Sequence, residues 1–303
     1  MTNAIETRNL EKRYKDFAAV QNLNLEVPTG SVFGFLGPNG AGKTTSIMML
    51  LGNIRPTQGS ATVLGEPIGN VKIRRRIGFL PEKFQFHEFL TAEEFLHLHG
   101  KLNGMKREER NRRIPIVLAR VGLQERSKSR LREFSKGMQQ RVGLAQAILH
   151  EPDLVILDEP TSALDPLGRR DVRDLVMELK SEGKTVLLNS HLLSEIEMTC
   201  DRVAIIKRGQ IEVQGTMDEL LTVASTVQVE VRGMNDAALS AVRSLVSKLR
   251  LERVPITQFT AHLKSEADIG ELARAIVQNG VELRALIPKR ETLEELFVRI
   301  MEQ

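Results

Sequence analysis

The chain has 303 residues with 43 Lys and Arg against 39 Asp and Glu, a formal net charge of +4, and 41% of its residues are hydrophobic. This composition excludes a disordered or collagen-like chain, and the length predicts two domains. The single cysteine, Cys200, excludes an internal disulfide, and no zinc-type Cys/His cluster is visible, so we expect no structural metal. No signal peptide or membrane-spanning apolar run is visible either, so we expect a cytoplasmic protein.

Short β-type runs alternate with helical patterns from residue 1 to about 215, which predicts an α/β domain with a largely parallel sheet. Strands are expected at residues 4–8, 23–27, 31–36, 60–63, 77–80, 154–157, 185–189, 203–207 and 210–214. The last two flank Arg208-Gly209 and are expected to form a hairpin. Between about residues 84 and 150 the apolar spacing becomes helical, so we expect a helical insertion within this domain. The whole domain is expected to span residues 1–218.

Residues 219–303 are expected to form a small accessory α/β domain. After a short helix near Thr216, the patterns predict a strand at 226–231, a helix at 235–249, one or two strands within 253–263, a helix at 267–279, a strand at 281–287 and a helix at 291–301. One face of the helix expected at 235–249 carries five apolar residues, namely Leu239, Val242, Leu245, Val246 and Leu249. A stripe of this width is expected to pack in a core.

A phosphate-loop pattern, G-x-x-x-x-G-K-[ST], lies between an apolar strand and a helical segment, as the motif requires. Glycines let the backbone N–H groups wrap phosphates, and the helix N-terminus adds partial positive charge. Lys43 is expected to reach the β- and γ-phosphates, with a catalytic role, and the Thr44 hydroxyl to ligate Mg²⁺. The residues expected to bind ATP here are Gly37, Pro38, Asn39, Gly40, Ala41, Gly42, Lys43, Thr44 and Thr45.

The apolar run at residues 154–157 ends in two carboxylates, Asp158 and Glu159. A buried strand that delivers acids at its carboxyl end places them for a task, because an unpaired buried charge is costly. Asp158 is expected to hold Mg²⁺, and Glu159 to orient or deprotonate the attacking water. An apolar run followed by Asp-Glu is common, and the acid could simply cap the next helix. The phosphate loop favours the metal site.

Four further motifs follow the order of a known family. Phe134-Ser-Lys-Gly-Met138 is similar to the signature Leu-Ser-Gly-Gly-Gln, Ser162-Ala-Leu-Asp165 to the D-loop, and Ser190-His191 to the switch histidine, while Tyr14 stands where an aromatic stacks on adenine. With the phosphate loop and the Asp-Glu pair, residues 1–218 resemble the ATP-binding subunit of an ABC transporter. The resemblance implies a P-loop NTPase fold, ATP as substrate, and a catalytic role for His191.

The resemblance also implies that one chain cannot complete its own ATP site. Ser135 can cap the helix expected from about residue 136 to 149, and Gly137 permits close backbone approach, so hydroxyl, N–H groups and helix dipole make a second anion site. In the family this site binds the γ-phosphate of ATP held by another subunit. We therefore expect two ATP-binding subunits, here a homodimer, to sandwich two ATP molecules head to tail.

Three positions depart from the family pattern. Lys136 replaces the first Gly of the signature and Met138 its Gln; the added positive charge lies near a phosphate site, so function is expected to survive. Glu82 stands where most members have a Gln that senses Mg²⁺ and the attacking water. A carboxylate can ligate Mg²⁺ directly or through water, so Glu82 is expected to join Thr44 and Asp158 at the metal.

The motif variants and the C-terminal domain together resemble the ATPases of bacterial ABC-2 type exporters, which handle drugs, antibiotics, lipids and polysaccharides. This implies integral-membrane permease subunits on other chains and a peripheral location on the cytoplasmic side of the cell membrane. The alternative is a soluble ABC-type ATPase that acts on ribosomes or nucleic acid. Such members carry two nucleotide domains or long coiled coils, neither of which is visible, so no specific nucleic-acid partner is expected.

Two further features bear on partners. Residues 83–90 hold three Phe in a chain with 4% aromatic residues, and these Phe are expected either to anchor the permease or to form the core of the helical insertion. Residues 72–132 hold 16 Lys and Arg against 7 Asp and Glu, a net charge of +9. This basic region is expected either to meet the permease and anionic lipids or to be a solvated face.

Overall fold

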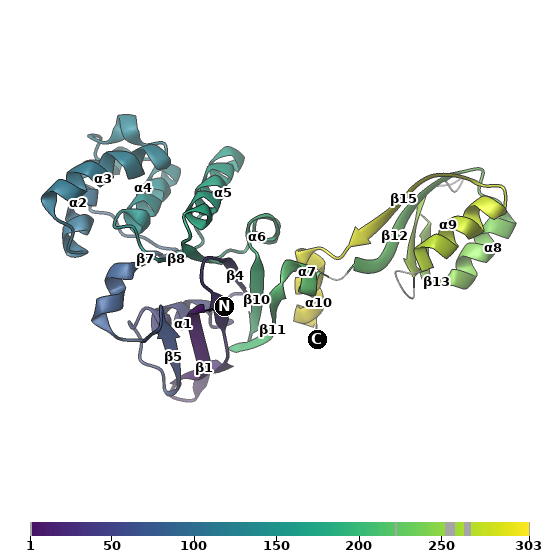
Figure 1. Ribbon diagram of the computed structural model, residues 1–303, viewed down its shortest axis with the longest axis horizontal. Coiled ribbons are helices and arrows are strands. Elements are labelled where there is room, and N and C mark those ends of the chain that lie inside the picture. The colour runs from purple at the N-terminus through teal and green to yellow at the C-terminus, as the bar shows by residue number, and fades with distance from the viewer. Residues whose placement is uncertain (1, 222, 252–257, 264–267, 303) are drawn as a thin grey trace. The chain divides into compact units, whose positions relative to one another are not determined.

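The computed structural model describes residues 2–221, 223–251, 258–263 and 268–302 (Figure 1). The chain divides into two compact units, Met1–Met217 and Asp218–Gln303. A short helix, α7 (Met217–Leu220), lies where the sequence predicts one after Thr216. Within the described residues, no helix combines the length and apolarity needed to cross a membrane.

The larger sheet of the first unit has the strand order β11-β10-β4-β9-β8-β7, and all its neighbours are parallel except the hairpin of β10 and β11 expected around Arg208-Gly209. Its strands are β4 (Val32–Leu36), β7 (Ile77–Leu80), β8 (Leu154–Asp158), β9 (Thr185–Asn189), β10 (Arg202–Lys207) and β11 (Gln210–Thr216). β4, β8 and β9 are buried along their whole length, which explains their mostly apolar sequences. Parallel alignment brings the carboxyl ends of β4, β7, β8 and β9 to one edge.

A second, antiparallel sheet has the order β2-β1-β5-β6, with β3 also paired to β1. Its strands are β1 (Asn3–Tyr14), β2 (Phe17–Leu23), β3 (Glu26–Pro28), β5 (Gln58–Val63) and β6 (Glu66–Pro67). Side chains from both sheets and from α1 (Lys43–Leu50) form one core, which includes Ile5, Phe33, Phe35, Ile47 and Met49. This core supports the loop between β4 and α1.

The prediction of a single strand at residues 23–27 is wrong. Leu23 ends β2 and Glu26 opens β3, and Thr7 of β1 bridges the break. The Thr7 hydroxyl donates to the Leu23 carbonyl at 2.8 Å and accepts from the Leu25 N–H at 2.7 Å. The Thr7 N–H also donates to the Leu25 carbonyl at 2.9 Å, so a side chain and a backbone group of another strand together hold the break, which local propensity does not reveal.

The helical subdomain consists of α2 (Ala92–Leu102), α3 (Arg107–Arg120) and α4 (Lys136–Ile148), which pack on one another (Figure 1). The helical pattern expected from about residue 84 begins only at Ala92, because Thr91 and Glu94 form a capping box. Three short 3-10 turns cover Val71–Arg76, Gln124–Arg126 and Leu131–Glu133, and α5 (Pro166–Ser181) and α6 (Leu193–Thr199) complete the unit.

The second unit folds as β-α-β-β-α-β with the antiparallel sheet order β13-β14-β12-β15, a ferredoxin-like arrangement. Its elements are β12 (Val223–Arg232), α8 (Asp236–Leu245), β13 (Val246–Leu251), β14 (Gln258–Leu263), α9 (Ile269–Gln278), β15 (Glu282–Arg290) and α10 (Leu293–Glu302). Its core joins Val227, Val229 and Phe259 of the sheet to Val242 and Ile276 of the helices.

The helix expected at residues 235–249 is too long. α8 ends at Leu245, and Val246 and Leu249 belong to β13, where they pair with Leu263 and Ala261 of β14. Tertiary strand pairing overrides the helical spacing of these apolar residues. Two expected boundaries lie outside the described residues. They are the start of the strands expected within 253–263 and Ala267, the first residue of the next expected helix.

Candidate active site

The candidate site lies at the carboxyl edge of the six-stranded sheet, where ligands bind in open parallel sheets. The phosphate loop follows β4, Asp158 ends β8, Asn189 ends β9, and Glu82 lies two residues after β7. His191 follows Asn189 by two residues. Residues separated by more than a hundred positions in sequence therefore meet because their strands are parallel neighbours.

The phosphate loop requires glycine where backbone approaches backbone. A Cβ atom at Gly37 would lie 2.3 Å from the carbonyl oxygen of Ile206, and one at Gly42 would lie 2.5 Å from that of Ala19. Gly42 also has a φ of 105°, in the left-handed region that favours glycine. The loop leads directly into α1 at Lys43, so it ends at a helix N-terminus, where N–H groups suit an anion.

The Lys43 ammonium lies within the loop, where its Nζ donates to the Gly37 carbonyl at 2.6 Å. Burial lowers the pKa of Lys43, while the charges of Glu159, Asp158 and Glu82 act in the opposite direction. Four ionisable groups from three parts of the chain thus interact electrostatically. Three carboxylates thus act on the Lys43 ammonium, and such an excess of negative charge is suited to further positive charge.

Asp158 is 2% exposed, and its side chain accepts a hydrogen bond from the side-chain amide of Asn189. Burial raises the pKa of Asp158, and the neighbouring charge of Glu82 raises it further, whereas the bond from Asn189 and the charge of Lys43 lower it. The ionised form of Asp158 is therefore unfavourable unless a cation lies nearby.

Glu159 is fixed at its backbone and at its carboxylate. Its φ of 54° is left-handed, and its N–H donates to the Asn189 carbonyl at 2.8 Å. The carboxylate Oε2 lies 2.6 Å from Nδ1 of His191, and when the carboxylate is ionised it can only accept, so that Nδ1 is then the donor. Burial raises the pKa of Glu159, and His191 opposes that shift. A carboxyl with a raised pKa is well suited to accept a proton.

The donor set fits Mg²⁺ bound together with a substrate. Within the part of the chain that the structure describes, no group of three or more His, Cys, Asp or Glu side chains is placed to hold a metal by itself. Magnesium commonly takes one or two carboxylates and completes its shell with phosphate oxygens and water. Asp158 and Glu82, whose charges interact, would be the hard oxygen donors, and the exposed Thr44 at the start of α1 would add a hydroxyl.

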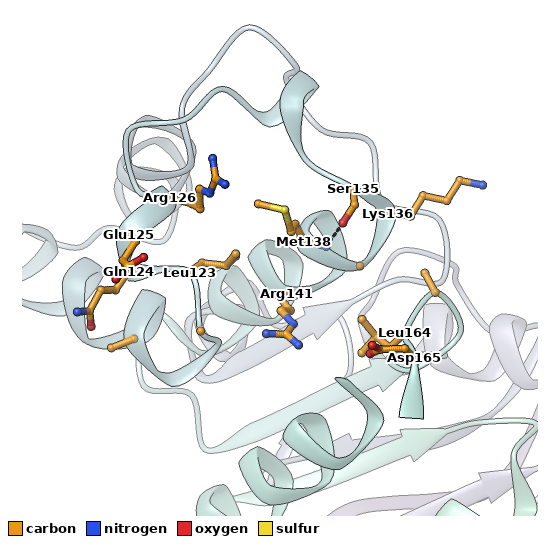
Figure 2. Close-up of a pocket in the computed structure, with 14 residues that line it drawn as sticks. Leu123, Gln124, Glu125, Arg126, Ser135, Lys136, Met138, Arg141, Leu164 and Asp165 are labelled. Carbon is orange, nitrogen blue, oxygen red and sulfur yellow. Dashed lines mark hydrogen bonds between the residues drawn. The ribbon is translucent and has the colours of Figure 1, made fainter. Parts of the chain in front are cut away.

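A separate groove of about 820 Å³ surrounds the N-terminus of α4 (Figure 2). Ser135 caps this helix, with its hydroxyl accepting from the Met138 N–H at 3.3 Å, and a Cβ atom at Gly137 would lie 3.2 Å from Leu164. In Figure 2, Lys136 extends away from Met138. The residues that line the groove include neither the phosphate loop nor Asp158 and Glu159. The structure therefore does not bring Ser135 and Gly137 to the site around Lys43.

Tyr14 lies at the end of β1 and is 46% exposed. The ammonium of Lys12 stands 5.1 Å from the centre of the Tyr14 ring. The ring is thus partly exposed with a cation over one face, and an aromatic ring of this kind can stack on a planar base.

Sequence reasoning missed Asn189, which bonds both members of the Asp-Glu pair: its side-chain amide donates to Asp158, and its backbone carbonyl accepts from the Glu159 N–H. The available signal was a polar residue at the end of an apolar strand, directly before Ser190-His191. It also missed Gln140, a buried amide within α4. The sequence offers little signal for Gln140, because its partner lies 19 residues away.

The three Phe residues of segment 83–90 differ in their surroundings. Phe84 and Phe86 pack against Phe95 of α2, with ring centres 5.8 and 5.6 Å away, so they belong to the core of the helical subdomain. Phe89 is 70% exposed. Of these three residues, Phe89 is the exposed one, whereas Phe84 and Phe86 are partly buried.

Part of the basic region 72–132 serves the fold. Arg76 pairs with Asp153 at 2.6 Å, Arg113 with Glu151 at 2.8 Å, and Arg120 with Glu178 at 3.1 Å. An experiment that reversed the charges of residues 74–76 to test the surface would therefore also break the ion pair between Arg76 and Asp153.

Comparisons with known proteins agree on one family. A family profile described as ABC transporter matches residues 20–162. An uncharacterised ABC transporter ATP-binding protein of Synechocystis sp. is 39% identical and aligns over 98% of this chain and 84% of its own. The bacitracin transport ATP-binding protein of Bacillus licheniformis is 37% identical over 99% of this chain and 98% of its own. A dimeric ATP-binding cassette in a post-hydrolysis state with ADP and Pi has a TM-score of 0.66 and 28% identity, covering 70% of this chain and 98% of that chain.

Proposed function

The chain belongs to the ABC transporter family as an ATP-binding subunit that hydrolyses ATP, and from this premise we propose that it energises export through separate membrane permease subunits. The relative named for bacitracin transport supports a role in transport, because its similarity covers the C-terminal unit as well as the ATPase unit. Residues 1–218 would form the ATPase domain and residues 219–303 an accessory domain. A peripheral position on the cytoplasmic side of the membrane follows from this role.

Within one subunit, the residues around Lys43 would bind ATP and Mg²⁺. The N–H groups of residues 37–45 and the Lys43 ammonium would bind the phosphates, and Tyr14 would stack on adenine. Thr44, Asp158 and Glu82 would hold Mg²⁺ with the phosphate oxygens, where the ion neutralises charge on the transferred phosphoryl group.

The hydrolytic step follows from the positions of Glu159 and His191. Glu159 takes a proton from water, the water oxygen forms a bond to the γ-phosphorus, and the bond to the β-phosphate oxygen breaks, leaving ADP and phosphate. His191 holds the carboxylate by the 2.6 Å contact and thereby sets its direction.

The groove at α4 would receive the ATP of a second subunit. Ser135 and Gly137 line a space large enough for a nucleotide, yet that space contains none of the residues around Lys43. This separation is the observation that supports a composite site, and it favours a head-to-tail homodimer that closes on ATP binding. Closure would move the permease, and hydrolysis would reset the dimer.

The variant Glu159→Gln tests this proposal. It keeps the size of the side chain but cannot accept a proton, so we expect ATP binding to persist, turnover to fall by about 100-fold or more, and an ATP-dependent dimer to accumulate. ATP hydrolysis and size-exclusion chromatography with ATP measure these effects. Glu66→Gln, at an exposed hairpin residue, serves as the matched control. Wild-type turnover in Glu159→Gln would refute the assigned role of Glu159.

The permease link requires a separate experiment. When the subunit and its permease are co-produced, the subunit should fractionate with the membrane and be recovered with the permease by affinity purification. Sedimentation with ribosomes whether or not the permease is present would contradict this proposal.

A further inference from the structure

Gln140 is a buried polar side chain of α4 with a defined partner at the catalytic edge of the sheet. It is 8% exposed, and its Nε2 donates to the backbone carbonyl of Glu159 at 3.2 Å. A buried amide without a partner is costly, so this bond is part of the packing of α4 on the sheet. Because α4 begins just after Ser135, the helix that opens at the signature also touches the peptide of Glu159.

Glu159 needs such support because its backbone is in an uncommon conformation. A non-glycine residue with a φ of 54° is unfavourable and persists where the surroundings hold it. The N–H of Glu159 is held by Asn189, and its carbonyl also accepts from the N–H of Ser162 at 3.3 Å. Ser162 lies in the same turn as Glu159, so among these bonds to the carbonyl only that of Gln140 comes from another element.

The position of α4 is itself held by contacts of the residue that follows Gln140. The next residue, Arg141, forms an ion pair with Asp171 of α5 at 2.9 Å and also donates to the Val121 carbonyl at 3.5 Å. The amide of Gln140 therefore projects from a helix that is tied to its neighbours. Such a donor can restrict the rotation of the Glu159 peptide and so the direction of its carboxylate.

We propose that Gln140 is a positioning residue for hydrolysis, which holds the Glu159 peptide so that the carboxylate meets His191 and the attacking water. This rests on the proposed role of Glu159 as the general base. Gln140 does not touch the nucleotide in this proposal; it acts through Glu159. Loss of its hydrogen bond should therefore slow the chemical step without weakening ATP binding.

The first test compares Gln140→Met with Gln139→Met. Met keeps the unbranched shape of Gln but has no donor, and Gln139 is the adjacent residue of α4, whose amide donates to the Leu131 carbonyl at 3.3 Å rather than to Glu159. We expect Gln140→Met to lower kcat about 10-fold with KM for ATP within about twofold of the wild type, and Gln139→Met to change kcat by less than about twofold. Unchanged kcat in Gln140→Met, or an equal loss in both variants, would overturn the proposal.

A double-mutant cycle separates positioning from general damage. When Gln140→Met is added to Glu159→Gln, the residual single-turnover rate should fall no further, because the group that Gln140 positions is already removed. A further 10-fold loss would show an independent role and overturn the proposal. Gln140→Leu provides a second apolar variant, and thermal unfolding checks that each protein folds.

The two assignments fail in different ways. If Glu159→Gln keeps wild-type turnover, the role of Glu159 is refuted. If Glu159→Gln is inactive while Gln140→Met keeps the wild-type kcat, only the inference about Gln140 is refuted.

Discussion

The Nδ1 atom of His191 lies 2.6 Å from Oε2 of Glu159, so the end of β9 and the end of β8 meet through a histidine and a carboxylate. The Glu159 side chain is 13% exposed and that of His191 65%. A mostly buried acid is thus held by a mostly exposed ring. This pair determines how hydrolysis should respond to pH.

His191→Ala should move the acid limb of the pH profile of kcat to higher pH. Burial raises the pKa of Glu159, and His191 acts in the opposite direction. The general base works in its ionised form, so kcat falls as the pH drops through the pKa of Glu159. Without His191 that pKa rises further, and the loss begins at a higher pH, together with a lower maximal kcat. The exposed His87 gives the control His87→Ala, and an acid limb that stays in place in His191→Ala would contradict the prediction.

Asp158→Asn should stabilise the metal-free protein while abolishing most turnover. Burial raises the pKa of Asp158, so the ionised form disfavours folding at neutral pH, and a neutral isostere removes that cost. We expect Tm to rise by about 2–4 °C at pH 7. In the wild type, the destabilisation by ionised Asp158 grows as the pH rises from the ordinary pKa of Asp to its raised pKa in the folded protein. The difference in Tm between Asp158→Asn and the wild type should therefore disappear below about pH 4. Calorimetry with a chelator measures it, and a lower Tm at pH 7 would refute it.

Gly42→Ala should destabilise far more than Gly65→Ala. Both residues have positive φ, 105° and 80°, so both substitutions strain the backbone, at a cost of about 1 kcal/mol. At Gly42 the new Cβ also lies 2.5 Å from the Ala19 carbonyl, whereas at Gly65 it meets nothing within 4 Å. We expect the loss of unfolding free energy at Gly42 to be at least about twice that at Gly65. Urea unfolding compares them, and equal losses would show that the close approach is unimportant.

Gly137→Ala should fold normally but impair dimer formation. The added Cβ would lie 3.2 Å from the flexible end of Leu164, so the unfolding free energy should change by less than about 1 kcal/mol. The methyl group would stand in the groove proposed to receive the second subunit's phosphate. In a Glu159→Gln background, ATP-dependent dimerisation should therefore weaken by about 10-fold or more. Gly270→Ala, in the first turn of α9, is the control, and undiminished dimerisation would contradict the composite site.

Phe89→Ala and Phe86→Ala should separate partner binding from stability. Phe89 is 70% exposed, so its loss should leave Tm and the ATPase activity of the isolated subunit unchanged while reducing recovery with the permease. Phe86 packs on Phe95 and Phe84, so its loss should lower the unfolding free energy by about 2–4 kcal/mol. Co-purification and thermal unfolding distinguish the two, and normal permease recovery with Phe89→Ala would exclude Phe89 as an anchor.

Secondary structure could be predicted best for short, mostly apolar strands with clear boundaries. β7 and β9 begin and end at the predicted residues, because the basic residue before each strand and Pro81 or Ser190 after it leave few alternatives. The prediction failed at residues 246–249, where the apolar spacing suits a helix but pairing with β14 makes a strand. It also failed at residues 23–27, where the Thr7 hydroxyl divides one expected strand into two.

The sequence by itself determined the phosphate loop, the Asp158-Glu159 pair and the family resemblance, because each motif is a contiguous segment whose chemistry depends on local order. Tertiary structure decided how these segments act together. The raised pKa of Glu159, its contact with His191 and the hydrogen bond from Gln140 all depend on parallel strands and on a helix packed against them. Burial and long-range contacts are set by the packing of the whole unit, so residue type and spacing alone do not contain them.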